Sequence, residues 1–228
     1  TAGWDQGLRM VKDNNTGLVW EVKSPAKGDV NFANDTYTWD DARDVYVAKL
    51  NEEEYGGFSD WRVPNKDELR SIINYDRTNP AVDTLFFPNC RTDFYWTSVT
   101  YQMQPSFGWG LFFGLGSGIV HGKKNKRLVR AVRGGFNTGF GVPDPGRFLD
   151  NGDGTVTDTV TNLMWQQGEN ARSNWFEALK SCERMDLAGY NDWRMPNIKE
   201  LNTILDLNYE DGWWYYRKLF PAEGLQPP

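Results

Sequence analysis

The order of apolar and polar positions predicts short strands and short helices within one repeating unit. Residues 8–22 have the pattern of a β-hairpin whose turn is Asn14-Asn15-Thr16-Gly17. A helix is expected after Thr38, because Thr38 and Asp41 have the spacing of an N-cap residue and its acidic partner. Further strands are expected at 95–99, 108–120 and 128–133.

One phrase occurs twice. Residues 57–69 read Gly-Phe-Ser-Asp-Trp-Arg-Val-Pro-Asn-Lys-Asp-Glu-Leu, and residues 189–201 read Gly-Tyr-Asn-Asp-Trp-Arg-Met-Pro-Asn-Ile-Lys-Glu-Leu. Such self-similarity indicates duplication of a folding unit. Two further segments recur in the same order, at 13–20 with 158–165 and at 39–42 with 175–178.

We interpret the repeated phrase as scaffold. Asn65 with Glu68 repeats the capping spacing just after a proline, so a second helix should begin there. In the second copy, Asn174 with Glu177 and Asn197 with Glu200 have the same spacing and predict two helices. Trp61 is expected to be a buried aromatic anchor. Arg62 can pair with a nearby carboxylate such as Asp60 or Glu68.

The repeats predict two domains. Residues 1–133 form the first, residues 134–147 are a Gly- and Pro-containing linker, and residues 148–228 are the second. No counterpart of the strands at 95–133 follows in the second unit, so we expect it to be incomplete. Either the protein continues, or a second copy or an assembly neighbour completes residues 148–228, because an uncovered helix face and an unpaired sheet edge are costly.

Composition narrows the classes of function. The formal net charge of −6 argues against nucleic-acid binding, which normally needs an extended basic surface. No apolar run approaches the roughly 20 residues needed for a membrane span. The chain begins at Thr1, as a processed mature chain or a fragment would. With only Cys90 and Cys182, at most one internal disulfide is expected.

Five motifs resemble those of one bacterial family. This is the Lcl C-terminal domain family (DUF1566), named for the C-terminal domain of the Legionella collagen-like protein, and the chain resembles two tandem copies of it, the second incomplete. The motifs are the Asp-Gly-Thr-Val opening at 153–165, the Trp-x-x-Ala helix at 39–42 and 175–178, the Asp-Trp-Arg phrase at 60–69 and 192–201, and the closing elements at 96–98 and 129–133.

The resemblance implies an α+β fold similar to C-type lectins, with two helices and a twisted, mostly antiparallel sheet, here duplicated. It also implies an extracellular, cell-surface or periplasmic protein, since the family's namesake is an adhesin that recognises sulfated glycosaminoglycans. Family members often carry a cysteine in the first helix and one in the closing strand. Tyr46 and Ala131 replace that pair in the first unit, and Cys182 has the helix position in the second.

Metal and catalytic sites find little support in the sequence. The calcium site of C-type lectins needs an acidic ligand where this chain has Val63-Pro64-Asn65 and Met195-Pro196-Asn197, so that site is rejected. A cation could instead be held by Asp150, Asn151, Asp153 and Asp158, although a hairpin turn also explains these residues.

We expect no cofactor and no enzymatic activity. His121, the only histidine, is expected to be passive in a turn, and no nucleophilic triad appears. The formylglycine-generating enzymes, which have a similar fold, use a cysteine pair near the closing strand that the first unit lacks. An oxidase of that kind is therefore the least favoured function.

Positive charge gathers in one segment of this acidic chain. Cations between two expected strands can hold sulfate or carboxylate groups through charge-assisted hydrogen bonds, although a solvated hairpin tip explains them equally well. Aromatic residues just before them could stack on sugar rings or pack in the core. The predicted ligand-binding residues are Lys123, Lys124, Lys126, Arg127, Arg130, Tyr101, Phe107 and Trp109.

Two functions of different classes follow. The first is a non-catalytic recognition module that binds a glycan, sulfated or acidic, or a protein ligand. The second is a structural subunit of a bacterial envelope assembly or filament, whose repeated domains pack against neighbours. Salt-sensitive binding to acidic glycans separates the two.

Overall fold

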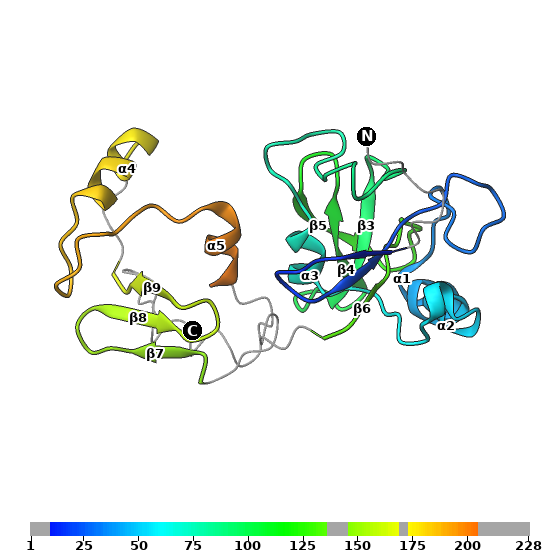
Figure 1. Cartoon of the computed structure of the whole chain (residues 1–228), viewed down its shortest axis with the longest axis horizontal. Helices are drawn as coiled ribbons and strands as arrows, with labels where there is room; N and C mark the ends of the chain where they lie inside the picture. The colour runs from blue at the N-terminus through cyan, green and yellow to red at the C-terminus, as the bar shows by residue number, and fades with distance from the viewer. Residues whose placement is uncertain (1–9, 136–145, 169–172, 205–228) are drawn as a thin grey trace. The chain divides into compact units, whose positions relative to one another are not determined.

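The computed structural model describes residues 10–135, 146–168 and 173–204 (Figure 1). The chain divides into two compact units, residues 1–137 and 138–228, with the boundary inside the predicted linker. Most of that linker lies outside the described residues. Its two ends are exceptions, since the Gly134 carbonyl accepts a hydrogen bond from Arg62 and Arg147 is buried in the second unit.

The hairpin predicted at 8–22 is confirmed in its described part. Strands β1 (Met10–Lys12) and β2 (Val19–Glu21) pair antiparallel, and Gly17 takes the positive φ that the turn requires. On its other side β2 pairs with β6 (Val132–Arg133), so strands from the two ends of the unit lie in one sheet.

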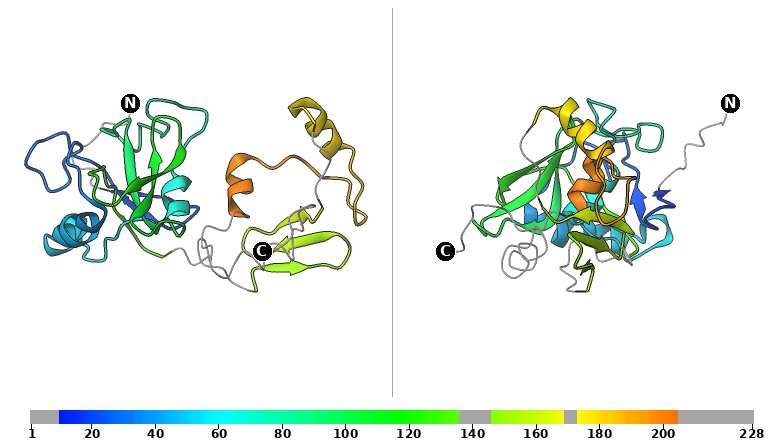
Figure 2. Two further views of the ribbon diagram at one scale, coloured as in Figure 1. Left: turned by 180° about the vertical axis from the view of Figure 1, so that it is seen from behind. Right: turned by 90° about the vertical axis from the view of Figure 1, so that its left-hand side faces the viewer.

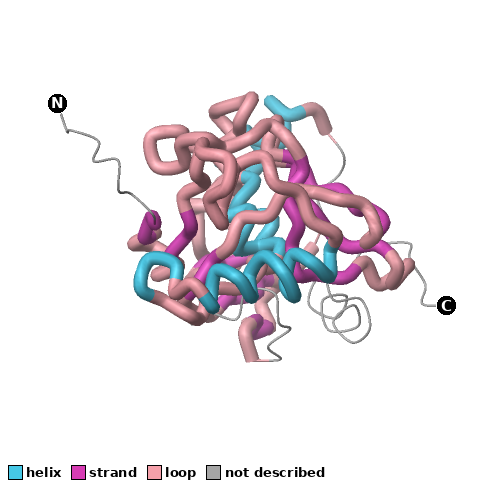
Figure 3. The backbone as a smooth tube through the Cα atoms, turned by 90° about the vertical axis from the view of Figure 1, so that its right-hand side faces the viewer, coloured by secondary structure: helices cyan, strands magenta, loops and turns pink. Residues whose placement is uncertain are grey.

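The first predicted helix is confirmed as three consecutive stretches, α1 (Trp39–Asp41), the π-helical η1 (Ala42–Val47) and α2 (Ala48–Glu52), which form one path in Figure 3. The Thr38 hydroxyl accepts a hydrogen bond from the Asp41 amide, as the capping spacing predicted. The buried side of this path packs into a core cluster with Trp61, Trp96 and Val129.

The repeated phrase is scaffold in the first unit. Trp61 is 2% exposed and donates its indole N–H to the carbonyl of Tyr55, in the 3₁₀ turn η2 (Tyr55–Gly57). Asn65 and Glu68 form a complete capping box at the start of α3 (Lys66–Ser71). Arg62 donates two hydrogen bonds to Glu68, of 2.7 and 2.6 Å, whereas Asp60 pairs with Arg133.

A second antiparallel sheet carries the predicted binding segment. Its strands are β3 (Phe94–Thr100), β4 (Phe107–Phe112) and β5 (Ser117–Gly122), and α3 packs on it (Figure 2). The unit thus has two sheets where one was expected. Residues 128–133, which we call the closing segment, touch both sheets, through an isolated bridge from Leu128 to Tyr95 of β3 and through the pairing of β6 with β2. Val132 also forms an isolated bridge with Arg62.

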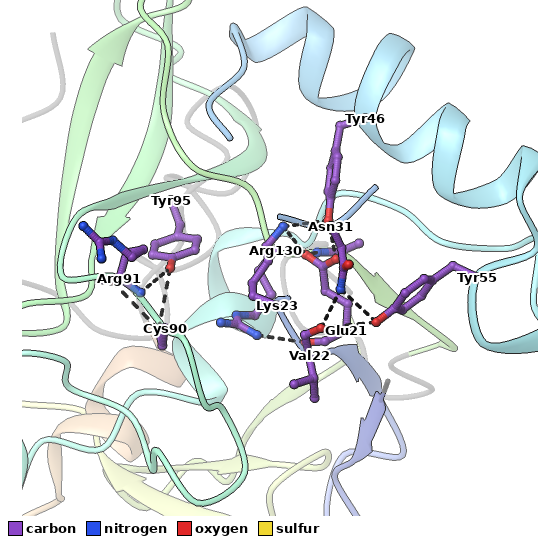
Figure 4. A network of polar contacts seen from close by, with 11 residues as sticks. Glu21, Val22, Lys23, Asn31, Tyr46, Tyr55, Cys90, Arg91, Tyr95 and Arg130 are labelled. Carbon is purple, nitrogen blue, oxygen red and sulfur yellow. Dashed lines mark hydrogen bonds and ion pairs between the residues drawn. The ribbon is translucent and has the colours of Figure 1, made fainter. Parts of the chain in front are cut away.

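A buried polar network holds the closing segment against β2 (Figure 4). The Glu21 carboxylate accepts hydrogen bonds from the Ala131 amide and from the Tyr46 hydroxyl, and it pairs with Lys23 at 2.8 Å. The Arg130 guanidinium donates to the Glu21 carbonyl at 2.8 Å. Burial lowers the pKa of Lys23, and the nearby Glu21 carboxylate is the main group that opposes this shift.

The second unit repeats the same local structures. Strands β7 (Phe148–Asp150), β8 (Thr155–Asp158) and β9 (Leu163–Gln166) form an antiparallel sheet, and β8 pairs with β9 in the register that β1 has with β2. Helices α4 (Trp175–Glu183) and α5 (Ile198–Thr203) begin at the asparagine caps that the spacing predicted. The predicted α+β class is therefore confirmed in both units.

The two units differ in how well their apolar side chains are covered. Leu69 of the first unit is fully buried, whereas its counterpart Leu201 is 42% exposed. Trp175, the counterpart of the partly buried Trp39, is 61% exposed. Within residues 146–168 and 173–204, helices and sheet thus leave part of their apolar surface open.

We predict that Glu21→Gln lowers the free energy of unfolding of the first unit by about 3–5 kcal/mol, because it leaves the buried Lys23 without its carboxylate. The Glu68→Gln variant should lose less, since its partner Arg62 is 39% exposed to water. Urea unfolding followed by amide exchange in β2 measures both. Equal losses in the two variants would contradict the prediction.

Candidate ligand-binding surface

The basic turn that follows β5 is fixed to the start of the first helical path. Lys123 accepts the Trp39 amide through its carbonyl at 3.0 Å, and Arg127 exchanges two backbone hydrogen bonds with Tyr37. The Lys123 ammonium lies 3.8 Å from the centroid of the Trp39 ring and donates to the Thr100 hydroxyl at 2.8 Å. We call residues 123–127 the basic tip, and its backbone is held on two sides.

The cations of the basic tip differ in how open they are to a ligand. Lys124 and Lys126 are exposed, and Lys123 and Arg127 are half-buried. Among the ion pairs of the described residues, none involves these four side chains. Since ammonium and guanidinium groups bind sulfate and carboxylate oxygens well, the basic tip can hold an anion.

His121 lies in β5, not in the turn where the sequence suggested it. Its ring packs edge-on against Phe94, with the two ring centroids 4.6 Å apart, and its Nδ1 lies 3.2 Å from an Arg127 nitrogen. Burial, and then the charge of Arg127, lower the pKa of His121, so the ring is neutral at neutral pH. A neutral ring accepts from Arg127 at Nδ1 and carries its proton on Nε2.

The predicted aromatic residues lie on the other face of the sheet. Successive side chains of a strand alternate between faces, and Trp39 packs where a side chain on Gly108 would stand, 2.6 Å from a Cβ there. Trp109 therefore points away from Trp39 and Lys123. The predicted surface is divided by the β3–β4–β5 sheet, and Trp109 does not join the basic tip.

Trp109 instead belongs to a second cationic cluster. Its ring packs edge-on against Tyr101, with the two ring centroids 5.6 Å apart, and the Lys66 ammonium lies 3.6 Å from the centroid of the Trp109 ring. Burial, and then the charge of Arg70, lower the pKa of Lys66 to about 8. Phe107 precedes Trp109 by two residues. Its backbone amide donates a hydrogen bond to the Gln104 carbonyl and so closes the 101–107 loop.

Lys66 was missed because its phrase was assigned to the scaffold. One signal was present in the sequence: the second copy of the phrase has Ile198 at this position, so the helix start does not need a lysine. In the first unit the lysine is 5% exposed and no ion pair of the described residues includes it.

The prediction that Arg130 belongs to the ligand surface is wrong. Arg130 is fully buried, lies over the Phe87 and Tyr95 rings and donates to the Glu21 carbonyl (Figure 4). Burial lowers its pKa, but the interactions with Cys90, Tyr95 and Glu21 outweigh burial and raise it. Arg130 therefore stabilises the core, and its guanidinium is not exposed to a ligand.

The acidic residues at 150–158 are engaged within their own hairpin. Asp158 accepts two hydrogen bonds from the buried Arg147, of 2.9 and 2.6 Å, and Asp153 accepts from the amide and hydroxyl of Thr155. Asp150 accepts the Gly152 amide, and Asn151 donates to Thr155 and Thr157. In the part of the chain that the structure describes, no group of three acidic, histidine or cysteine residues could hold a metal.

One protein-family model matches most of this chain. The model of the Lcl C-terminal domain matches residues 9–133 and 154–225, one match for each repeat. The chain belongs to the Lcl C-terminal domain family. A search of the curated proteins found no match. None of the described helices of this Lcl C-terminal domain protein has the length and apolar character to cross a membrane.

We predict that Lys66 titrates near pH 8 in the folded protein. Its pKa is below that of a lysine in the unfolded chain, so the unfolded state binds the extra proton between about pH 8 and pH 10.5 and stability rises with pH through that window. The advantage of a Lys66→Met variant over the wild type should therefore shrink from pH 7 to pH 10 in urea unfolding. A Lys66 carbon shift that titrates above pH 10 would contradict this.

Proposed function

We propose that this protein is a non-catalytic recognition module, located at the cell surface, in the periplasm or outside the cell, whose basic tip binds a sulfated or acidic glycan. The observation that carries the proposal is the basic tip itself. One ordered turn of a chain whose net charge is −6 carries four cations outside every ion pair of the described residues, and two of them, Lys124 and Lys126, are exposed.

The geometry of the tip suits a polyanion. Lys123 is held by Trp39 and Thr100, so one cation is positioned before a ligand arrives and less side-chain entropy is lost on binding. Lys124 and Lys126 remain exposed and can adapt to the spacing of the anionic groups. A flexible pair beside a fixed cation favours charge recognition over one rigid small ligand.

Family membership supports the same location and ligand class. The namesake of the Lcl C-terminal domain family is an adhesin that recognises sulfated glycosaminoglycans, and we extend that ligand class to this chain. We also propose that each unit derives from a C-type-lectin-like fold by duplication. The two helical segments and antiparallel sheets of residues 10–135 support this relationship.

A structural subunit of an envelope assembly is the second candidate. The exposed apolar side chains of the second unit favour it, because a stable module would normally cover them. A protein ligand bound there is compatible with either candidate. An oxidase similar to the formylglycine-generating enzymes is the third candidate, and no observation on the described residues favours it; Cys90 and Cys182 are both free.

We predict that Lys124→Ala with Lys126→Ala weakens binding to immobilised heparin about tenfold at low salt, because two charge-assisted contacts worth together about 1.4 kcal/mol are lost. Affinity of the wild type should fall steeply as salt rises. The matched control is Lys12→Ala with Lys27→Ala, which removes the same charge from exposed positions outside the tip.

Surface plasmon resonance on a series of sulfated and unsulfated glycans provides the measurement. Failure of the wild-type protein to bind any acidic glycan at low salt would refute the proposal. Equal losses in both double variants would show that net charge, not the tip, determines binding.

A further inference from the structure

The backbone at Gly118 of β5 leaves room beside two cations and an aromatic ring. Gly118 is exposed, and a Cβ atom built on it would lie 3.5 Å from Cε of Lys66, 3.6 Å from Nη2 of Arg70 and 3.9 Å from Cζ3 of Trp109. These are ordinary van der Waals distances, so one more heavy atom fits there without moving a side chain. We call this space, beside Lys66, Arg70 and Trp109, the Gly118 site.

Both cations of the Gly118 site have donors that no described residue accepts. Lys66 is 5% exposed, and its ammonium contacts the Trp109 ring but forms no hydrogen bond or ion pair with a described residue. The Nη1 atom of Arg70 is buried without a hydrogen-bond partner among the described residues, and it lies 3.8 Å from a carboxylate oxygen of Asp67. Buried donors are nearly always hydrogen-bonded, so a ligand that accepts from both side chains would remove this deficit.

Two positive charges face one negative charge at the Gly118 site. Burial, and then the charge of Arg70, lower the pKa of Lys66 to about 8, while Asp67 opposes the shift. The repulsion between Lys66 and Arg70 therefore outweighs the attraction of Asp67 for Lys66. An anion bound beside both cations would offset this repulsion and would favour the charged form of Lys66.

The second copy of the helix forms without these two cations. Ile198 and Asn202 have the positions of Lys66 and Arg70, and α5 begins with the same capping box as α3. The helix therefore does not require a lysine and an arginine at these positions. A buried lysine also costs desolvation free energy that an isoleucine does not. The pair is a feature of the first unit that the scaffold does not explain, and it indicates a role in binding.

We propose that Lys66 and Arg70 bind an oxyanion of a ligand at the Gly118 site, of the kind that carboxylate and sulfate groups supply. Ammonium and guanidinium groups form charge-assisted hydrogen bonds to such oxygens. The Trp109 ring borders the site and packs against Tyr101, so the two rings can contact the apolar body of an organic acid. The site lies on the face of the sheet away from Lys123, so it does not rest on the function proposed for the basic tip.

The pH midpoint of the Lys66 Cε resonance, followed by NMR on the full chain, reports whether the site is occupied. Acetate, sulfate or chloride is added at equal ionic strength, so that screening is the same in each sample. We expect acetate and sulfate to raise the midpoint by about one pH unit relative to chloride, because each binds about tenfold more tightly to the charged lysine. Arg70→Gln should abolish the rise. Arg43→Gln, which removes an exposed guanidinium elsewhere in the first unit, should keep it.

A second pair of variants needs no added anion. Gly118→Asp places a carboxylate at the site and should raise the midpoint of Lys66 by about one pH unit, whereas the matched Gly118→Asn should leave it near pH 8. A Cβ at Gly118 makes ordinary contacts and φ there is not positive, so both variants should fold.

Three results would overturn the proposal. A wild-type midpoint above pH 10 without added anion would show that a carboxylate of the chain itself fills the site. A midpoint that acetate and sulfate leave unchanged would show that no anion binds there. An equal rise in the wild type and in Arg70→Gln would show that the anion binds elsewhere.

Discussion

The closing segment, residues 128–133, is the element on which the first unit depends. It is bound on one side by β2 and on the other by Arg62, and the Glu21 carboxylate accepts its Ala131 amide. A buried carboxylate is stable only when partners surround it, and Lys23, Tyr46 and the Ala131 amide do so. The segment joins both sheets and both core clusters, because its residues pack in each.

The same segment explains where the unit can present a ligand site. Arg130 and Val132 are buried in the core. The exposed cations of this stretch, Lys124 and Lys126, therefore precede them in the basic tip. The backbone of the tip is held by Trp39 at its first residue, Lys123, and by Tyr37 at its last residue, Arg127, from where the chain continues into the closing segment. Residues 123–133 thus supply both the exposed cations of the basic tip and the strand that completes the core below it.

The sequence predicted what is local. Helix caps at Thr38, Asn65 and Asn197 were found because a cap and its partner lie three residues apart. The burial of Arg130 could not be found that way, since its partner Glu21 is 109 residues distant. The division of Tyr101 and Trp109 from Lys123 likewise depends on which face of a strand each residue takes, which shifts with a one-residue change in register.

The central claim is that the closing segment completes the first unit and that the buried Glu21 carboxylate holds it there. Residue-resolved amide hydrogen exchange of the intact chain tests this directly, because the amides of β2 and of residues 128–133 can be followed in the wild type and in Glu21→Gln. The account predicts that these amides exchange at least about a hundredfold faster in the variant, since the buried carboxylate that accepts the Ala131 amide is lost. Equal protection in the two proteins would contradict it.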